Sequence, residues 1–381
     1  MPILLSSART YAEGARCELS VAAGGPGEGA GTRLLYNLPP VYRVPAVWAS
    51  LSEIGIMAID HSLLRMFMKM QERYKLSGDI VTIGVQDVMF NHQGGAEFFK
   101  EENYRFTPID EKQRTYRTSK AQSLYEGIFN VKNPMHMHDL FKMLGFRNAS
   151  SLDAFDADSP TILQDMNKPI PDQYKNKYDV VFDVGSMEHV FDVKQFVQNC
   201  VEMVKDDGVL IIYDALVGWH NECFYNFQTP FFFDVFKANG FDNISVFLNY
   251  FPKYHDFGKG KTTWLRFEYG DRPTFRKRNY CTHIFFIARK AKTLPEFVVP
   301  MQGYYTEYYN DFVKAQSGPE GEKAALSHYM LENMPTPVRA LFPMLVPIYR
   351  ALPNWLRTPI IDTLIYLKNR SKLAARERIR C

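Results

Sequence analysis

The pattern of apolar positions is clearest between Tyr178 and Asp214. Val180 to Phe182 form a short apolar run without helical spacing, which is typical of a strand covered on both faces. From Val190 to Val204, apolar residues recur at three- and four-residue spacing and predict a helix packed on a sheet. Val209 to Tyr213 then form a second buried strand. A strand, a helix and a strand within about 35 residues predict a βαβ crossover and a doubly wound, mostly parallel α/β sheet.

The turn after the first of these strands is dense in polar groups. Asp183 to His189 supply two carboxylates, a glycine, a hydroxyl and an imidazole. Ligands of such sheets bind outside the carboxyl ends of the strands, so these groups are expected to face a pocket. The alternative is an ordinary strand-to-helix turn, because Ser and Asp favour helix caps whatever the function.

The rest of the chain divides into flanking regions. Residues 1–45 contain a Gly/Ala-rich stretch and are expected to be mobile. Residues 46–77 form a helical extension, with a helix from about Ser50 to Lys75 that packs on the sheet domain, residues 78–290. An insert at 88–134 is rich in Phe and Tyr and predicts either a lid over the site or a solvated surface excursion.

Residues 291–381 form a C-terminal extension that is expected to be helical. From Pro335 onward it combines apolar residues with many Arg and Lys, the composition of a helix that lies on a membrane surface. An ordinary helix docked on the domain, or the partner surface of a homodimer, would have the same composition.

Composition narrows the class of protein. With 381 residues, 46% hydrophobic and 23% charged, the chain can bury one large core, and a net charge of +3 gives no indication of nucleic-acid binding. The five cysteines lack CxxC spacing and are expected to be free thiols, without a metal site. No apolar stretch reaches about 18 residues, and no secretory signal is recognisable. These features predict a cytoplasmic protein, with the inner face of the membrane as a further location.

Three segments together resemble class I S-adenosylmethionine-dependent methyltransferases, especially bacterial members associated with surface-polysaccharide gene clusters. They are DVGSMEHVFD (183–192), HNECFYNFQTPFFFDVFKANGF (220–241) and LGFRNASSLDAFDADSPTILQDMNKPIP (144–171). The resemblance covers about residues 78–290. It implies a seven-stranded Rossmann-like sheet, S-adenosyl-L-methionine as cofactor, and O-methylation of a sugar or another small hydroxyl acceptor in glycan biosynthesis.

The resemblance also assigns cofactor-binding residues. Gly84 would let the backbone approach the methionine part, and Asp153 would accept the ribose hydroxyls. Asp165 would meet the adenine amino group, with Met166 beside the ring. The methionine end and the transfer site would be lined by Asp183, Gly185, Ser186 and Met187. A turn glycine and capping carboxylates are the alternative interpretation of these positions.

The loop after the first strand departs from the family. The family carries GxGxG there, whereas this chain has Gly84 followed by Val, Gln, Asp and Val. The amide of Gln86 is a candidate to replace the missing backbone contacts. The same departure disfavours a nicotinamide-dependent oxidoreductase, because a pyrophosphate requires GxGxxG. It leaves open a methyltransferase-like scaffold that has lost its cofactor.

Two histidines are candidates for the base that deprotonates a hydroxyl acceptor. We favour His220, because the segment after the strand that ends at Asp214 borders the acceptor in this family. His189 is the alternative, and Glu188 is a candidate to orient either imidazole or to stabilise a first helical turn.

Overall fold

The computed structural model describes residues 58–117, 131–217, 219, 223–251, 262–269, 281–303, 305–306, 376 and 378–380. The chain divides into two compact units, residues 1–50 and 51–381, and every described residue belongs to the second. The expectations for residues 1–45, for most of the extension beyond residue 306 and for the cysteines Cys17 and Cys381 lie outside the described residues.

The helices and strands alternate along most of the second unit. In chain order they are α2 (His61–Tyr74), β1 (Asp79–Ile83), α3 (His92–Glu101), η1 (Glu111–Gln113), α5 (Met137–Met143), β2 (Asn148–Asp153), η2 (Asp156–Asp158), β3 (Ile162–Leu163), η3 (Asp172–Tyr174), β4 (Tyr178–Val184), η4 (Met187–His189), α6 (Val193–Met203), β5 (Val204–Val217), α7 (Thr229–Ala238), β6 (Phe241–Phe251), β7 (Thr263–Phe267), β8 (Cys281–Lys290) and β9 (Arg378–Arg380).

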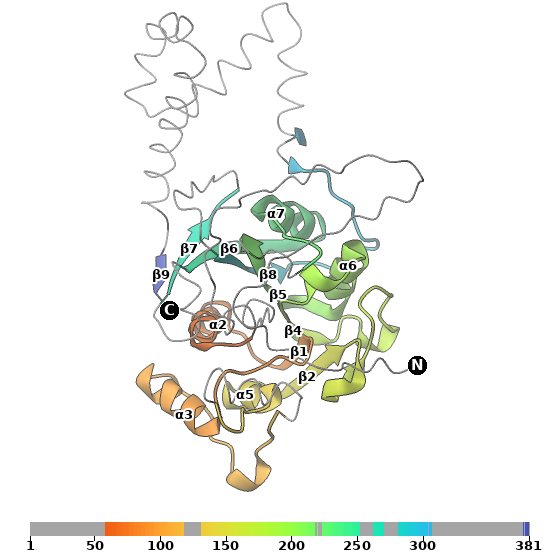
Figure 1. The fold of residues 1–381 in the computed structure, drawn as a ribbon. Helices are drawn as coiled ribbons and strands as arrows, with labels where there is room; N and C mark the ends of the chain where they lie inside the picture. The colour runs from red at the N-terminus through yellow and green to blue at the C-terminus, as the bar shows by residue number, and fades with distance from the viewer. Residues whose placement is uncertain are drawn as a thin grey trace, which may run out of the picture. The chain divides into compact units, whose positions relative to one another are not determined.

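The strands form one nine-stranded sheet in the order β3-β2-β1-β4-β5-β8-β6-β7-β9 (Figure 1). The first five strands of this order are parallel, and α6 connects β4 to β5 as the apolar pattern predicts. Helices α2 and α5 lie on one face and α6 and α7 on the other (Figure 1). The doubly wound α/β architecture is therefore confirmed.

The prediction of seven mostly parallel strands is wrong. β8 is antiparallel to both β5 and β6, and β7 and β9 extend the sheet with further antiparallel pairs. Only eleven residues connect Phe251 to Thr263, too few for the crossover that a parallel pair requires. The end of the C-terminal extension is also not helical, because Arg378–Arg380 pair with β7 as its edge strand.

The helix expected from about Ser50 begins at His61 in the structure. The side chain of Asp60 accepts a hydrogen bond from the Leu63 amide at 2.7 Å and caps α2 while its own backbone is extended. The apolar face of α2 buries Leu63, Leu64 and Phe67 in a core shared with β4 and α5. This packing against the sheet agrees with the prediction.

The described part of the 88–134 insert belongs to the core. Phe90, Phe98 and Phe99 are buried in the same cluster as α2 and α5, and Tyr104 and Phe106 pack against it. These five aromatic residues therefore pack with α2 and α5, and the role of the insert as a lid stays a prediction. Residues 118–130 of the insert lie outside the described part.

Candidate functional site

The chain reverses its direction of winding between β1 and β4. From β1 it proceeds outward to β2 and β3 and then returns to β4 on the other side of β1. Such a switch point leaves a crevice outside the carboxyl ends of the two central strands, where open α/β sheets bind ligands. Gly84 ends β1 here, and Gly185 and Ser186 follow β4.

Gly84 lies where three segments meet. Its φ of +83° is in the left-handed region, and its amide donates to the carbonyl of Leu152 in β2 at 2.6 Å. A Cβ at this position would lie 2.9 Å from Nε2 of Gln86 and 3.2 Å from Oγ of Ser186. The left-handed backbone conformation favours glycine here.

The carbonyl of Ile83 connects the β1 loop to the β4 turn. It accepts a hydrogen bond from Nε2 of Gln86 at 2.5 Å and from Oγ of Ser186 at 3.0 Å. Gln86 is buried, and the hydrogen bond directs its amide nitrogen at the loop to which it belongs. These two hydrogen bonds hold the β1 loop against the β4 turn.

Asp153 ends β2 beside this loop. One carboxylate oxygen accepts the amide of Val85 at 3.3 Å and the other accepts the amide of Phe155 at 3.0 Å. A carboxylate has about four acceptor positions, so each oxygen retains capacity for another donor. The side chain is half-buried at the carboxyl edge and can therefore meet a ligand hydroxyl.

Asp165 and Met166 lie in the loop after β3. Asp165 accepts the backbone and side-chain amides of Asn167, both at 2.9 Å, and these hydrogen bonds lower the pKa of its carboxyl. Met166 is buried in the core on the α6 face. The buried Asn199 holds this loop by donating to the carbonyls of Met166 and Lys168. The sequence-based role of both residues at the adenine stays a prediction.

Asp183 is fully buried and shapes the β4 turn. Its two oxygens accept the amides of Ser186 at 3.1 Å and Met187 at 3.2 Å. Burial raises the pKa of Asp183 to about 7, even though these hydrogen bonds favour the charged form. The side chains of Asp183, Met187 and Glu188 are buried, and the expectation that the turn faces a pocket stays a prediction.

The base candidates differ in environment. The side chain of His189 is 48% exposed, and partial burial lowers the pKa of its imidazole, which favours the neutral form near pH 7. Its Nε2 lies 3.7 Å from Oε1 of Glu188, beyond hydrogen-bonding distance. Glu188 instead accepts the Ala215 amide at 3.3 Å through Oε2. His220 lies outside the described residues.

Sequence reasoning missed the arginine that joins the β1 and β2 loops. Arg117 is buried and donates to Asp87 at 2.8 Å and to Asp158 at 2.9 Å. No local signal marks it, because its partners are 30 and 41 residues away in the chain. The nearby His136 and His138, at the start of α5, have pKa values lowered chiefly by burial, that of His136 to about 4.

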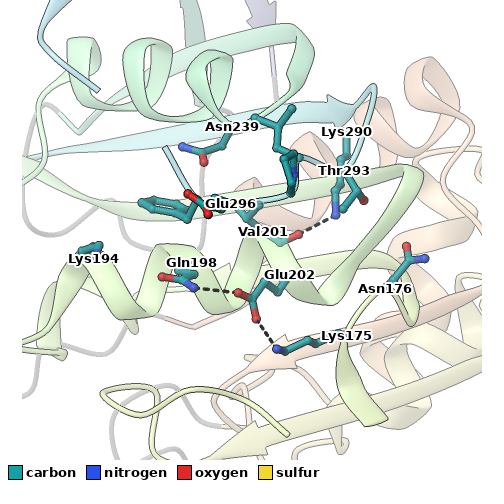
Figure 2. A pocket seen from close by; sticks show the side chains of 13 residues that line it. Lys175, Asn176, Lys194, Gln198, Val201, Glu202, Asn239, Lys290, Thr293 and Glu296 are labelled. Atoms are coloured by element: carbon teal, nitrogen blue, oxygen red, sulfur yellow. Dashed lines mark hydrogen bonds and ion pairs between the residues drawn. The ribbon is translucent and has the colours of Figure 1, made fainter. Parts of the chain in front are cut away.

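A cavity of about 420 Å³ lies at the opposite edge of the sheet, near the start of β4 and the end of α6 (Figure 2). Its polar groups bond to one another. Glu202 accepts from Gln198 at 2.8 Å and pairs with Lys175 at 3.3 Å, while Lys290 donates to the carbonyls of Val201 and Val204. This cavity therefore presents few free partners to a ligand.

Within the described ranges, no helix is long and apolar enough to cross a bilayer. The same residues contain no group of three or more His, Cys, Asp or Glu side chains that could hold a metal ion. Cys200 and Cys223, the two cysteines whose state the structure gives, are free thiols.

No protein-family model matches the sequence, and no curated protein matches it. Several solved methyltransferases have a distantly similar backbone. One is a carbon methyltransferase, CurJ, at 13% identity and TM-score 0.31, covering 61% of this chain and 54% of that one. Another is a possible histamine N-methyltransferase from Thermotoga maritima, at 10% identity and TM-score 0.29, covering 60% and 97%.

A third similar structure contains a bound product of the cofactor. It is the 1,6-didemethyltoxoflavin-N1-methyltransferase of Burkholderia thailandensis with 1,6-didemethyltoxoflavin and S-adenosylhomocysteine, at 9% identity and TM-score 0.30, covering 67% of this chain and 94% of that one.

Proposed function

We propose that this protein is an S-adenosylmethionine-dependent methyltransferase that methylates a hydroxyl of a small sugar-like acceptor in glycan biosynthesis. One observation carries the proposal: at the switch point between β1 and β4, the carbonyl before the left-handed Gly84 accepts a hydrogen bond from Ser186 in the β4 turn, while Asp153 at the end of β2 accepts the amide of Val85 after it. An acidic residue at the end of the second strand is suited to ribose hydroxyls in folds of this type.

The sheet and the loop favour a nucleoside ligand without a pyrophosphate. A dinucleotide-binding sheet continues in parallel beyond β5, whereas here the reversed strand β8 separates β5 from β6. The next helix, α3, begins only at His92, eight residues after Gly84, so no helix starts directly at the β1 turn to receive a pyrophosphate. S-adenosylmethionine combines a nucleoside with an amino acid and meets both conditions.

The residues present fit such a group. Asp153 would accept the ribose hydroxyls, Gly84 leaves its backbone accessible, and the turn from Gly185 to Met187 would border the sulfonium end. When bound, the cofactor supplies an electrophilic methyl group for in-line displacement. Asp183 holds the β4 turn in shape through two amide hydrogen bonds, so it is a positioning residue.

The chain must also deprotonate and orient the acceptor. A neutral imidazole at His220 or His189 would take the hydroxyl proton, with a contribution of about 10²-fold or more to the rate. Holding the acceptor in line in a dry pocket provides a further large acceleration. We favour His220 as the base, from the sequence.

A scaffold that has lost its cofactor is the second candidate. It is favoured by the self-contained β1 loop, in which the Gln86 amide is already directed at the Ile83 carbonyl. Calorimetric titration of the wild-type protein with S-adenosylmethionine separates the two proposals. Saturable binding supports the methyltransferase, and no detectable heat at millimolar cofactor supports the scaffold.

The proposal for the C-terminal extension concerns location and assembly. We propose that its cationic, apolar segment makes peripheral contact with an anionic membrane surface, at the inner face in a cytoplasmic setting, with homodimerisation as the alternative. Two of its arginines act at the sheet instead: Arg376 pairs with Glu268 at 2.6 Å, and Arg378 lies in β9.

A further inference from the structure

The loops after β1 and β2 each carry a carboxylate that pairs with the same arginine. Arg117 donates through Nε to Asp87 at 2.8 Å and through Nη2 to Asp158 at 2.9 Å. Asp87 lies three residues after Gly84, and Asp158 lies five residues after Asp153. The arginine therefore connects the two loops that carry residues proposed to bind the cofactor. We call Arg117, Asp87 and Asp158 the loop clamp.

The loop clamp is more buried on its cationic side than on its acidic side. The side chain of Arg117 is 7% exposed, whereas those of Asp87 and Asp158 are 21% and 29% exposed. Hydrogen bonds from a guanidinium to carboxylates are strong and directional, and burial limits their screening by salt. Water can solvate the two carboxylates if the arginine is removed. Loss of the clamp should therefore release the loops without unfolding the chain.

The insert fixes the position of Arg117. The amide of Arg117 donates to the carbonyl of Pro134 at 3.0 Å, and the neighbouring Tyr116 pairs with Met135 in an isolated antiparallel bridge. The amide of Met135 donates to the carbonyl of Phe90 at 3.1 Å, and the side chains of both residues are buried in the core. The backbone of Arg117 is thus held by the core while its side chain reaches the two loops.

Asp153 depends on both of the clamped loops for its orientation. One of its oxygens accepts the amide of Val85, two residues before Asp87, and the other accepts the amide of Phe155, three residues before Asp158. The first of these hydrogen bonds is long, at 3.3 Å, and is a weak restraint by itself. A displacement of either loop would therefore turn the carboxylate of Asp153.

We propose that Arg117 is a positioning residue for the cofactor, because it holds the β1 and β2 loops at the spacing at which Asp153 can accept the ribose hydroxyls. This inference rests on the proposed function. Arg117 acts through Asp153 and the loop backbone, and it makes no contact with the ligand. Loops that are ordered before the ligand arrives lower the entropic cost of binding.

Substitutions of two buried arginines separate this role from a general effect on the insert. Arg117→Met removes the guanidinium and should weaken S-adenosylhomocysteine binding about fivefold or more, within the range for residues of one hydrogen-bond network. Arg117→Lys keeps the charge without the planar fork and should recover part of the loss. The matched control is Arg65→Met. Arg65 is 14% exposed and pairs at 2.7 Å with Glu102, outside both loops, so affinity should stay within about twofold.

A double-mutant cycle tests whether Arg117 acts through Asp153. Calorimetry measures the dissociation constant of S-adenosylhomocysteine for the wild type, Arg117→Met, Asp153→Ala and the double variant. A positioning role predicts that the double variant binds about as weakly as Asp153→Ala alone. Two losses that multiply, or an affinity of Arg117→Met within about twofold of the wild type, would overturn the proposal.

Asp158→Ala breaks the same clamp at a partly exposed side chain and serves if Arg117→Met does not fold. In the ligand-free protein, either substitution should speed amide exchange at residues 84–88 and 153–159, whereas Arg65→Met should leave exchange there unchanged. If the wild type binds S-adenosylhomocysteine and Asp158→Ala binds it equally well with unchanged exchange, the positioning role fails and the methyltransferase proposal stands. If the wild type does not bind it, the proposed function fails, and the positioning role fails with it.

Discussion

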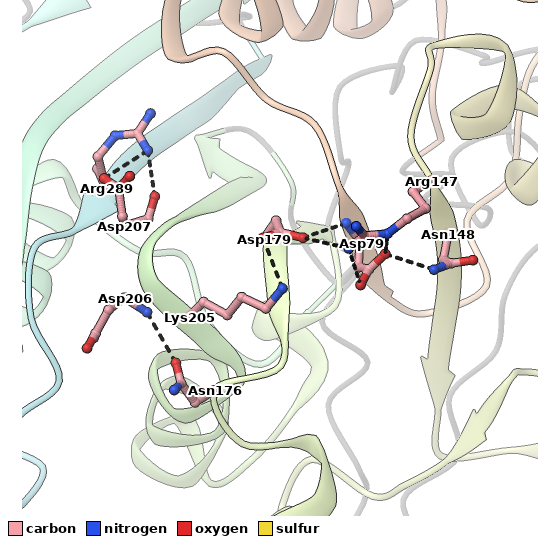
Figure 3. Close-up of polar contacts among 9 residues, drawn as sticks. All are labelled: Asp79, Arg147, Asn148, Asn176, Asp179, Lys205, Asp206, Asp207 and Arg289. Atoms are coloured by element: carbon pink, nitrogen blue, oxygen red, sulfur yellow. Dashed lines mark hydrogen bonds and ion pairs between the residues drawn. The ribbon is translucent and has the colours of Figure 1, made fainter.

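The polar groups at the two ends of the parallel strands differ in how completely they are paired. We call these ends of the sheet its two edges. At the edge where β1 and β4 begin, the charged groups satisfy one another (Figure 3). Asp79 accepts from Arg147 and Asn148 at 2.8 Å, and Asp179 accepts from Lys205 at 3.0 Å and from the Asp79 amide at 2.7 Å. Such closed networks are typical of groups that stabilise the fold.

At the edge where β1 and β4 end, polar groups are buried without being fully satisfied. Asn249 and Trp264 retain unpaired groups, and Asp214 has one carboxylate oxygen without a partner among the described residues. A protein that maximised stability alone would not leave these groups unpaired. We therefore expect the first edge to maintain the sheet and propose that the second edge binds the ligand.

The largest expected effect lies at the binding edge. His220→Ala should lower turnover by about 10²-fold or more and leave cofactor affinity nearly unchanged, because a general base acts on the acceptor proton. His189→Ala should instead weaken cofactor binding or lower stability, since His189 follows the β4 turn. Steady-state rates of methyl transfer to an unmethylated sugar acceptor, together with calorimetry, distinguish the two. The opposite pattern would exchange the roles.

The next effect compares one aspartate at each edge. Asp153→Ala should weaken S-adenosylmethionine binding by about 1.5 to 3 kcal/mol, the range for losing charge-assisted hydrogen bonds. Asp179→Ala should lower the free energy of unfolding and leave the dissociation constant within twofold. Both are measured by calorimetry and urea denaturation. Equal losses of binding in the two variants would remove the distinction between the edges.

Substitution of Lys290 tests whether residues at the edge where β1 and β4 begin affect stability without affecting cofactor binding. Its buried ammonium donates to the carbonyls of Val201 and Val204 at the end of α6, so Lys290→Met should lower the free energy of unfolding by about 1 to 3 kcal/mol. Lys194→Met is the control, because Lys194 lines the same cavity but is exposed, and its effect should stay within about 0.5 kcal/mol. A change in cofactor affinity in Lys290→Met would contradict the assignment.

Asp183 should make the stability of the folded protein depend on pH. Because burial raises the pKa of Asp183 to about 7, the folded protein retains a proton that the unfolded chain has lost. The contribution of this group to stability therefore falls as the pH rises from about 4 to about 7 and stays constant above that. Asp183→Asn should flatten this part of the melting-temperature profile. An unchanged profile would show that Asp183 is ionised throughout.

The smallest effect concerns the last strand of the sheet. Truncation at Lys323 removes β9, exposes the edge of β7 and should lower stability modestly, while the cofactor dissociation constant stays within a few-fold. Attachment to anionic vesicles should fall in a sedimentation assay. Unchanged vesicle binding would remove the membrane proposal, and loss of folded protein would show that β9 is essential to the sheet.

Local sequence patterns predicted the central strands of the sheet, whereas its outer strands depend on pairing between residues far apart in the chain. The β4, α6 and β5 unit follows from contiguous apolar spacing, and it is confirmed. β9 has three residues, and nothing in the Arg-Ile-Arg triplet indicates a partner more than a hundred residues earlier. Its arginines were therefore assigned to a surface helix.

Residues at the carboxyl ends of the strands also differed in how far the sequence predicted them. Gly84, Asp153 and Ser186 were predictable because each follows or ends a recognisable strand. The buried row of Asn249, Trp264 and His283 was not, because only the register of three antiparallel strands brings these residues together. The one local signal was His283, a titratable residue just before the apolar run from Ile284 to Ala288.

Hydrogen–deuterium exchange with and without S-adenosylhomocysteine tests the difference between the edges most directly. We expect slower exchange at residues 83–88, 153–167 and 183–189, where the strands β1 to β4 end. Exchange should be unchanged at residues 175–177, 201–206 and 290–297, which lie at or beside the cavity near the start of β4. Protection confined to this second group, or no protection in either group at millimolar ligand, would contradict a ligand site at the carboxyl ends of the strands.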